Sequence, residues 1–262
     1  MTQTGKLVFL GTGGSAGVPM IACSCATCLS QDIKNKRLRS SVLLEIKGKT
    51  LLIDAGPDFR AQALAYHLKK LDGILLTHTH FDHVSGLDEL RAFYVLHGHV
   101  LPVLVSKQTL HTLKKRYDYL FEERQDGANL TAQLEFHLLK SEWGCTQFCG
   151  LPVHYVSYQQ AGVPVNGFRF GSLAYLTDIK EISHEVIDAL AGVEVLVMSA
   201  LREKPSKMHL TFQEAMTLAQ KIGAQQTYFT HIGHETEHHA INDRLPKGYA
   251  LAYDGLQISF KL

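Results

Sequence analysis

The stretch Thr77-His78-Thr79-His80-Phe81-Asp82-His83 determines how the rest of the chain is interpreted, because three histidines and one aspartate fall within six positions. Neither a helix nor a strand needs that composition in order to fold. The apolar run at 71–76 predicts a buried strand before it, and apolar residues at helical spacing follow it at 84–93. The cluster is therefore expected on a loop between a strand and a helix, where α/β proteins place their ligands.

The spacing within this loop predicts two neighbouring binding points. His78 and His80 are two residues apart on an extended segment, so both point to one side, and Asp82 and His83 follow as the chain turns into the helix. A centre with two ions roughly 3.5–4 Å apart needs such an arrangement. The alternative is a polar turn with satisfied histidines, but four ligand-type residues in six positions favour metal binding.

A second cluster consists of Cys23, Cys25 and Cys28, three of the five cysteines of the chain. In a reducing compartment this crowding favours a metal over disulfides. Three thiolates can surround one zinc ion, and a closed structural site needs a fourth ligand from elsewhere. The alternatives are three reduced cysteines in a loop, or an iron–sulfur cluster, which would usually need one more cysteine.

Length and charge restrict the function classes. The chain has 262 residues, with 26 Lys and Arg against 25 Asp and Glu, for a net charge of +1. That balance does not call for a nucleic acid or an anionic membrane as a partner. No apolar run has the length of a membrane span or a secretory signal, so we expect a cytoplasmic protein.

Strands and helices are expected to alternate along the chain, which predicts the α/β class. Residues 59–71 and 212–222 are expected to form helices, the latter with Thr211 as N-cap. The expected strands lie at 6–10, 41–46, 50–54, 71–76, 151–156, 168–170, 173–178, 193–198 and 226–230.

The pattern His-x-His-x-Asp-His after an apolar strand resembles the signature of the metallo-β-lactamase superfamily, and Leu10-Gly11-Thr12-Gly13 is similar to the start of its cyclic-phosphodiesterase and tRNA-processing members. The resemblance implies one hydrolase domain over residues 1–262, folded as a four-layer αββα sandwich. Within the superfamily the chain is most similar to the phosphoribosyl 1,2-cyclic phosphate phosphodiesterases of phosphonate breakdown. A barrel amidohydrolase also carries His-x-His after a strand, but the added Asp82-His83 pair argues against that fold.

The resemblance also assigns roles to single residues. It implies a binuclear Zn or Mn centre, with Asp54 beneath the histidine loop to orient it, and it makes His209 and Asp82 the candidate catalytic residues. It implies a structural zinc on the cysteine cluster, for which His238 and His239 remain alternatives to His234. The implied ligands are His78, His80 and His154 for the first ion, Asp82, His83 and His231 for the second, Asp178 as the bridge, and Cys23, Cys25, Cys28 and His234 for the structural zinc.

The expected reaction is hydrolysis of a small, cyclic ribose phosphodiester by a hydroxide held between two ions, with His209 protonating the leaving alkoxide. A homodimer is compatible with the sequence. Three alternatives use related motifs: an ester, lactone or thioester hydrolase, a tRNA 3′-end nuclease, and a non-catalytic relative of the pyrroloquinoline-quinone biosynthesis protein. The nuclease is disfavoured by the low positive charge. The non-catalytic protein should lack some metal ligands, whereas this chain is expected to retain all of them.

Overall fold

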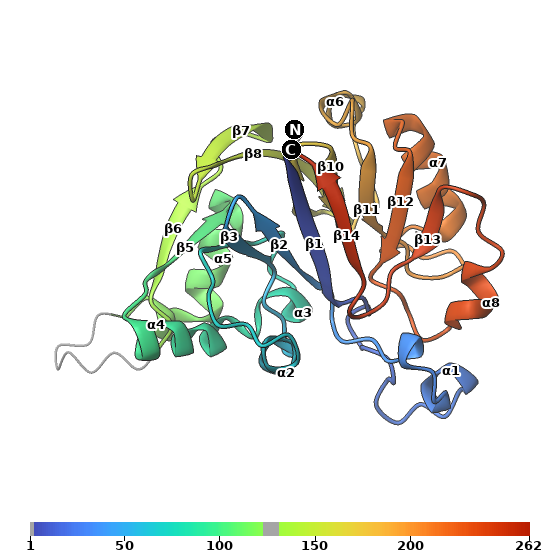
Figure 1. The fold of residues 1–262 in the computed structure, drawn as a ribbon, viewed down its shortest axis with the longest axis horizontal. Coiled ribbons are helices and arrows are strands. Elements are labelled where there is room, and N and C mark those ends of the chain that lie inside the picture. The colour runs from blue at the N-terminus through green and yellow to red at the C-terminus, as the bar shows by residue number, and fades with distance from the viewer. Residues whose placement is uncertain (1–2, 123–130) are drawn as a thin grey trace.

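Two β-sheets form the centre of the molecule. The computed structural model describes residues 3–122 and 131–262, and its sheets each contain seven strands (Figure 1). The first sheet has the order β14-β1-β2-β3-β4-β5-β6, with bounds β14 Gln257–Lys261, β1 Thr4–Gly11, β2 Ser41–Ile46, β3 Lys49–Ile53, β4 Gly73–Leu75, β5 Leu101–Val105 and β6 Leu134–Leu138. The second has the order β13-β12-β11-β10-β9-β8-β7, with bounds β13 Tyr249–Leu251, β12 Gln226–Thr230, β11 Val195–Ser199, β10 Leu173–Leu176, β9 Val163–Phe170, β8 Leu151–Gln160 and β7 Trp143–Phe148.

Each sheet is antiparallel over one half and parallel over the other. Strands β3 to β6 are parallel neighbours, and so are β10 to β13. Strand β8 is antiparallel to β9, which is antiparallel to β10, so β8 and β10 run in the same direction. The carboxyl ends of β8, β10, β11 and β12 consequently lie at one edge of the second sheet, where loops collect functional residues.

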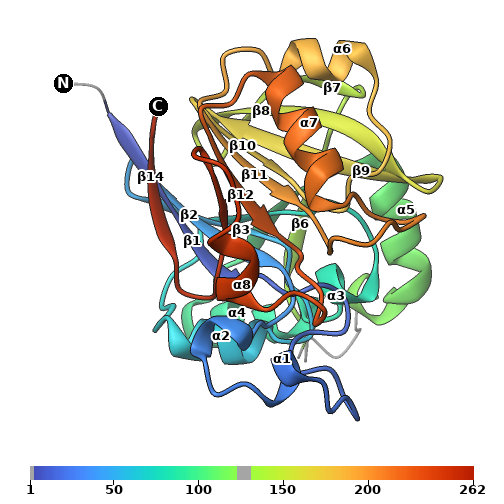
Figure 2. The ribbon, with the colours of Figure 1, turned by 90° about the vertical axis from the view of Figure 1, so that its right-hand side faces the viewer.

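Three apolar clusters hold the layers together. Phe9 and Leu51 of the first sheet pack with Phe168 and Val197 of the second, which forms the core between the sheets. The outer face of each sheet forms a separate cluster with its helices. Helices α2 Phe59–Ala65, α3 Phe81–Val84, α4 Arg91–His97 and α5 Lys107–Arg116 lie against the first sheet, and α6 His184–Ala189, α7 Phe212–Ile222 and α8 His238–Asn242 lie against the second (Figures 1 and 2).

The arrangement confirms the predicted αββα sandwich. The predicted helix at 212–222 is confirmed to the residue as α7, with a capping box between Thr211 and Glu214 and with Gly223 at φ 83° ending it. The helix predicted at 59–71 is too long, because α2 ends at Ala65 and His67 adopts the left-handed φ of 49°. The described part of the chain contains no helix with the length and apolar character to cross a membrane.

Candidate metal centre

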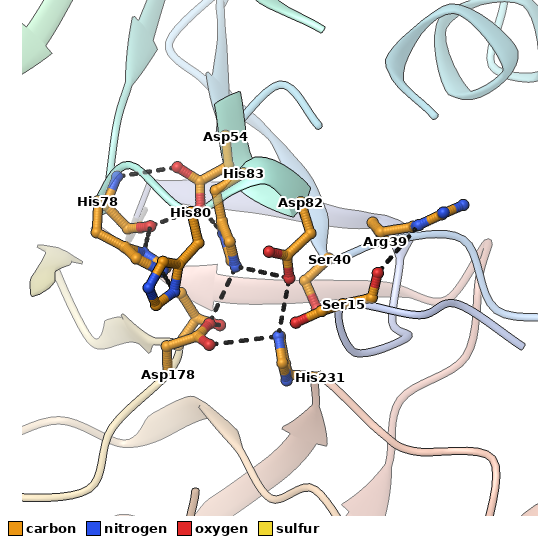
Figure 3. A network of polar contacts seen from close by, with 12 residues as sticks. Ser15, Arg39, Ser40, Asp54, His78, His80, Asp82, His83, Asp178 and His231 are labelled. Carbon is orange, nitrogen blue, oxygen red and sulfur yellow. Dashed lines mark hydrogen bonds and ion pairs between the residues drawn. The ribbon is translucent and has the colours of Figure 1, made fainter. Parts of the chain in front are cut away.

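Three strand ends deliver acidic and imidazole side chains to one point. Asp54 directly follows β3, Asp178 lies two residues beyond β10, and His231 directly follows β12. All three have left-handed backbone conformations, with φ of 63°, 53° and 57°. Non-glycine residues adopt this conformation at a cost, and Asp and His do so more readily than most. The three side chains point toward one region, which the histidine loop also reaches (Figure 3).

The histidine loop meets these strand ends from β4. His80 is the residue before α3, while Asp82 and His83 lie within this short helix rather than on the expected loop. The ring atoms His78 Nε2 and His80 Nδ1 are 2.9 Å apart, so the two imidazoles converge as their spacing predicts. The potential ligand atoms gather in three overlapping groups: His78, His80 and Asp178; Asp82, His83 and His231; and Asp178, His209 and His231.

Asp54 contacts the histidine loop at the place where the family resemblance puts an orienting aspartate. Its Oδ1 accepts a hydrogen bond from the Thr77 backbone N–H at 2.9 Å, and its Oδ2 accepts one from the Thr77 hydroxyl at 2.7 Å. The same Oδ2 lies 2.7 Å from Nδ1 of His83 (Figure 3). A carboxylate on Nδ1 places the proton there, and Nε2 of His83 is left with a lone pair directed away from Asp54.

Beyond His83, imidazole nitrogens and carboxylate oxygens converge on one another. Its Nε2 lies 3.1 Å from Asp178 Oδ2 and 3.4 Å from Asp82 Oδ2, and it is buried without a hydrogen-bond partner. His231 Nε2 lies 3.3 Å from both Asp82 Oδ2 and Asp178 Oδ1. Buried acceptors that face one another need a proton or a metal cation between them. Imidazole nitrogens with carboxylate oxygens form a donor set that suits divalent Zn or Mn, so these residues fit the implied ions.

The protonation of these groups follows from their surroundings. Burial lowers the pKa of His83, but the charges of Asp178, Asp82 and Asp54 outweigh it and raise that pKa well above its ordinary value. Burial raises the pKa of Asp178, but His231 and His83 bring it well below the usual range. Burial also lowers the pKa of His78, which keeps this ring neutral. In the group of Asp82, His83 and His231, charged carboxylates therefore face imidazoles that bind a proton tightly, and this proton competes with any metal cation for the same position.

His209 lies beside this cluster, as its predicted role requires. Its ring stacks on His231 with 4.8 Å between the centroids, and its Nδ1 is 3.8 Å from Asp178 Oδ1. Burial lowers the pKa of His209 to about 4, so its imidazole is neutral near pH 7 and carries one N–H. A neutral ring at this place can donate a hydrogen bond to an oxygen of a bound substrate.

The assignment of His154 to the first ion is wrong. His154 is exposed in the middle of β8, where it pairs with Cys145 and Arg169. Its neighbours Val153 and Tyr155 belong to the core between the sheets, so the alternation of the strand turns His154 to the outer face. Six more residues of β8 follow, which at about 3.3 Å per residue puts it about 20 Å from the strand end.

Gln160 ends β8 at the edge where the ligand groups lie, and sequence reasoning missed it. Its Nε2 donates to Asp178 Oδ1 at 2.9 Å, and the side chain is buried. The expected strand ended at residue 156, four positions too early. The signal was available, because the turn at Ala161-Gly162 marks where the strand must end. The expectation that the chain keeps all three histidine ligands of the first ion is therefore wrong.

The structure brings the cysteine cluster together with His234, the residue that the resemblance implies as its fourth ligand. Ligand atoms of Cys23, Cys25, Cys28 and His234 lie within 4.8 Å of one another, with His234 Nδ1 3.3 Å from Cys23 Sγ and 3.5 Å from Cys25 Sγ. The Cys28 backbone N–H and His234 lower the pKa of Cys25 to about 6, which favours the thiolate that zinc requires. Neither His238 nor His239 belongs to this group.

Comparison with known proteins assigns the family. The model of the β-lactamase superfamily domain matches residues 49–232, which include the histidine loop, Asp178 and His231. The chain belongs to the metallo-β-lactamase superfamily. This confirms the resemblance seen in the sequence and agrees with the two-sheet sandwich.

Several known proteins are similar in sequence to this chain. An octanoyltransferase of Porphyromonas gingivalis is 34% identical over 255 residues, which are 96% of this chain and 51% of that protein. The chain thus spans about half the length of this relative. The anti-Pycsar protein Apyc1 of Paenibacillus harenae is 26% identical over 214 residues, covering 74% of this chain and 83% of that protein.

Solved structures agree with the fold of the superfamily domain. A diphosphatase from the PhnP family superposes with a TM-score of 0.91 and 38% identity, covering 100% of this chain and 99% of the other. Zinc-bound PqqB from Methylobacterium extorquens superposes with a TM-score of 0.75 and 20% identity, covering 97% and 99% of the two chains. This second likeness concerns the fold alone.

Proposed function

We propose that the protein is a metal-dependent hydrolase of small phosphate esters that uses two divalent ions. One observation carries this proposal: Asp178 belongs to the ligand group of His78 and His80, and its carboxylate also contacts His83 and His231 of the other group. Oδ2 lies 3.1 Å from His83 Nε2, and Oδ1 lies 3.3 Å from His231 Nε2, while the same carboxylate also groups with His78 and His80. A carboxylate in this position can bridge two cations. When bound, such ions supply Lewis acidity toward a phosphoryl oxygen and lower the pKa of a water molecule.

The residues of the chain position the reactants. His78, His80 and Asp178 would hold one ion, and Asp82, His83 and His231 would hold the other, with Asp54 fixing the ring of His83. His209 lies on the Asp178 and His231 side of the centre, where its N–H can donate to the oxygen of the leaving group. Zinc and manganese both suit this nitrogen and oxygen donor set.

The substrate class has two candidates, a phosphodiester and a diphosphate. The sequence favours a cyclic ribose phosphodiester, through its similarity to the phosphoribosyl phosphodiesterases. The diphosphate is favoured by the superposed PhnP-family diphosphatase, at 38% identity over the whole chain. Both reactions displace an oxygen from phosphorus and need the same stabilisation of charge. We propose a single phosphate-active site and rank the phosphodiester first.

The deciding experiment is hydrolysis of bis(p-nitrophenyl) phosphate by zinc- or manganese-loaded protein. His80→Ala should reduce turnover by at least a hundredfold, whereas His154→Ala, the exposed histidine of β8, should leave it unchanged. Wild-type protein is then compared on a ribose cyclic phosphate and a nucleoside diphosphate ester, which ranks the two substrate classes. Absence of phosphodiester and diphosphate turnover in protein with both ions bound would reject the proposal in favour of carboxylic ester or thioester substrates.

A further inference from the structure

Gln160 has a buried side-chain amide in which the nitrogen forms a hydrogen bond and the oxygen does not. Its side chain is 1% exposed, and its Nε2 donates to Asp178 Oδ1 at 2.9 Å and lies 3.4 Å from each ring nitrogen of His209. Its Oε1 is buried without a hydrogen-bond partner. A buried carbonyl oxygen without a donor costs free energy, and such groups in folded proteins call for an explanation such as an absent ion.

The location of Gln160 supplies that explanation. It stands at the end of β8, on the edge of the second sheet from which Asp178 and His231 also project. Among the described residues, His78 and His80 group with Asp178 and with no further imidazole. Gln160 contacts Asp178, the carboxylate of this group, at the oxygen that also faces His209 and His231, so its Oε1 is a buried amide oxygen beside the group. An amide oxygen is a ligand for divalent cations.

The two positions consequently differ in their donors. The position of Asp82, His83 and His231 has two imidazoles and, with Asp178, two carboxylates. The position of His78 and His80 has two imidazoles, the shared carboxylate and a neutral amide. A second negative charge near a cation strengthens binding, and an imidazole holds zinc better than an amide oxygen does.

We infer that Gln160 completes the His78–His80 position with a neutral amide and makes it the weaker, exchangeable position of the centre. This inference rests on the proposed two-metal function. It predicts that the two active-site ions leave in separate steps, the ion near Gln160 first. It also predicts that Gln160→His removes the difference in zinc binding between the two positions.

The test measures zinc release from intact protein. Zinc-loaded protein is incubated with a graded series of dipicolinate, and the zinc that remains on each chain is counted by mass spectrometry. We expect wild-type protein to release its first ion at a chelator concentration at least tenfold below that for the next. Gln160→His should raise that first concentration at least tenfold. Gln159→His, whose side chain lies on the opposite face of β8, should leave it unchanged.

The outcomes separate this inference from the function on which it rests. A single release step for both active-site ions in wild-type protein would overturn the inference and leave the two-metal function standing, and this measurement needs no variant to fold. An unchanged first step in folded Gln160→His protein would also overturn it. Zinc uptake by the cysteine group alone would reject the two-metal function and the inference together.

Discussion

Nδ1 of His83 lies 2.7 Å from Oδ2 of Asp54, and both side chains are fully buried. The residues are 29 positions apart, on α3 and directly after β3. This contact determines which nitrogen of His83 faces the other ligands, because Asp54 holds the Nδ1 proton. Asp54 thereby acts on the centre through His83. Among the described residues, it forms hydrogen bonds with Thr77 and His83 but not with Asp82 or Asp178.

Asp54→Asn should weaken the metal centre while the fold survives. The amide still accepts from Thr77, but it no longer favours a proton on Nδ1 of His83. Loss of such a partner typically lowers metal affinity or activity by about 10–100-fold. Zinc affinity and phosphodiester turnover measure the effect. Asp72→Asn is the matched control, because Asp72 is also largely buried but bonds to Lys49 and Thr50. Equal losses in the two variants would contradict the assigned role.

Arg116 should favour substrates with a second anionic group. Its Nη1 donates to the Thr79 carbonyl at 2.7 Å, and it lines a cavity of about 200 Å³ together with His80 and Thr112. A charged hydrogen bond is worth about 1.5–3 kcal/mol, so Arg116→Ala should raise KM for a nucleoside diphosphate ester roughly tenfold or more. KM for bis(p-nitrophenyl) phosphate should change little. Lys115→Ala, an exposed neighbour, is the control, and a uniform rise for both substrates would contradict selectivity by Arg116.

Cys25→Ser should remove one zinc ion per chain and destabilise the fold. Three thiols and His234 hold the loop around α1 (Ala26–Leu29) to the segment after β12. Metal binding energy of such sites contributes to folding, and a loss of about 2–3 kcal/mol lowers Tm by roughly 5–10 °C in a chain of this size. Zinc content and calorimetry measure both effects. Cys145→Ser, at an exposed cysteine outside the cluster, should change neither. Unchanged zinc content in Cys25→Ser would reject the structural site.

Asp254 should make stability decrease as the pH rises from about 4 to about 6. Burial raises the pKa of Asp254 to about 6, although its oxygens accept hydrogen bonds from Leu38 N–H and the Thr12 hydroxyl, each at 2.7 Å. The unfolded pKa is about 3.9, so the folded state binds the proton more tightly across this window. This contribution is fully present below about pH 4 and is lost as the pH passes 6, which amounts to at most about 3 kcal/mol.

The comparison of wild type with Asp254→Asn isolates this effect. The variant cannot ionise, so its free energy of unfolding should increase relative to wild type as the pH rises from 4 to 7. Urea unfolding at several pH values measures the difference, with Asp188→Asn, at an exposed carboxylate, as the control. A difference between wild type and Asp254→Asn that is independent of pH would show that the Asp254 carboxyl is not perturbed as described.

Local patterns predicted most of the site, because several ligands are close in the chain. His78, His80, Asp82 and His83 share one loop and short helix, so their spacing alone predicts two groups. Their position after an apolar strand could be predicted from the sequence as well. The predicted helix at 59–71 was too long for a different reason. The amphipathic pattern continues past Ala65, but Tyr66 and the left-handed His67 end the helix to redirect the chain toward β4.

The error at His154 shows where a pattern in the sequence is insufficient. A histidine in a strand-like run satisfied the expected ligand type, but the pattern at 151–156 gave neither the length of β8 nor the face on which each residue lies. The register of β8 against β7 and β9 turns His154 outward and carries the strand on to Gln160. An error of four residues in the predicted strand end therefore singled out His154 and overlooked Gln160, the residue that contacts Asp178.

By itself the sequence determined the class of fold, the histidine loop and the cysteine cluster, since each depends on residues within a few positions of one another. Only the tertiary structure decided which distant residues join them. Asp82 and His231 are 149 positions apart, and their 3.3 Å contact exists because β4 and β12 end in the same space between two sheets. Sheet register and strand direction set that meeting point, and they are properties of the packed chain.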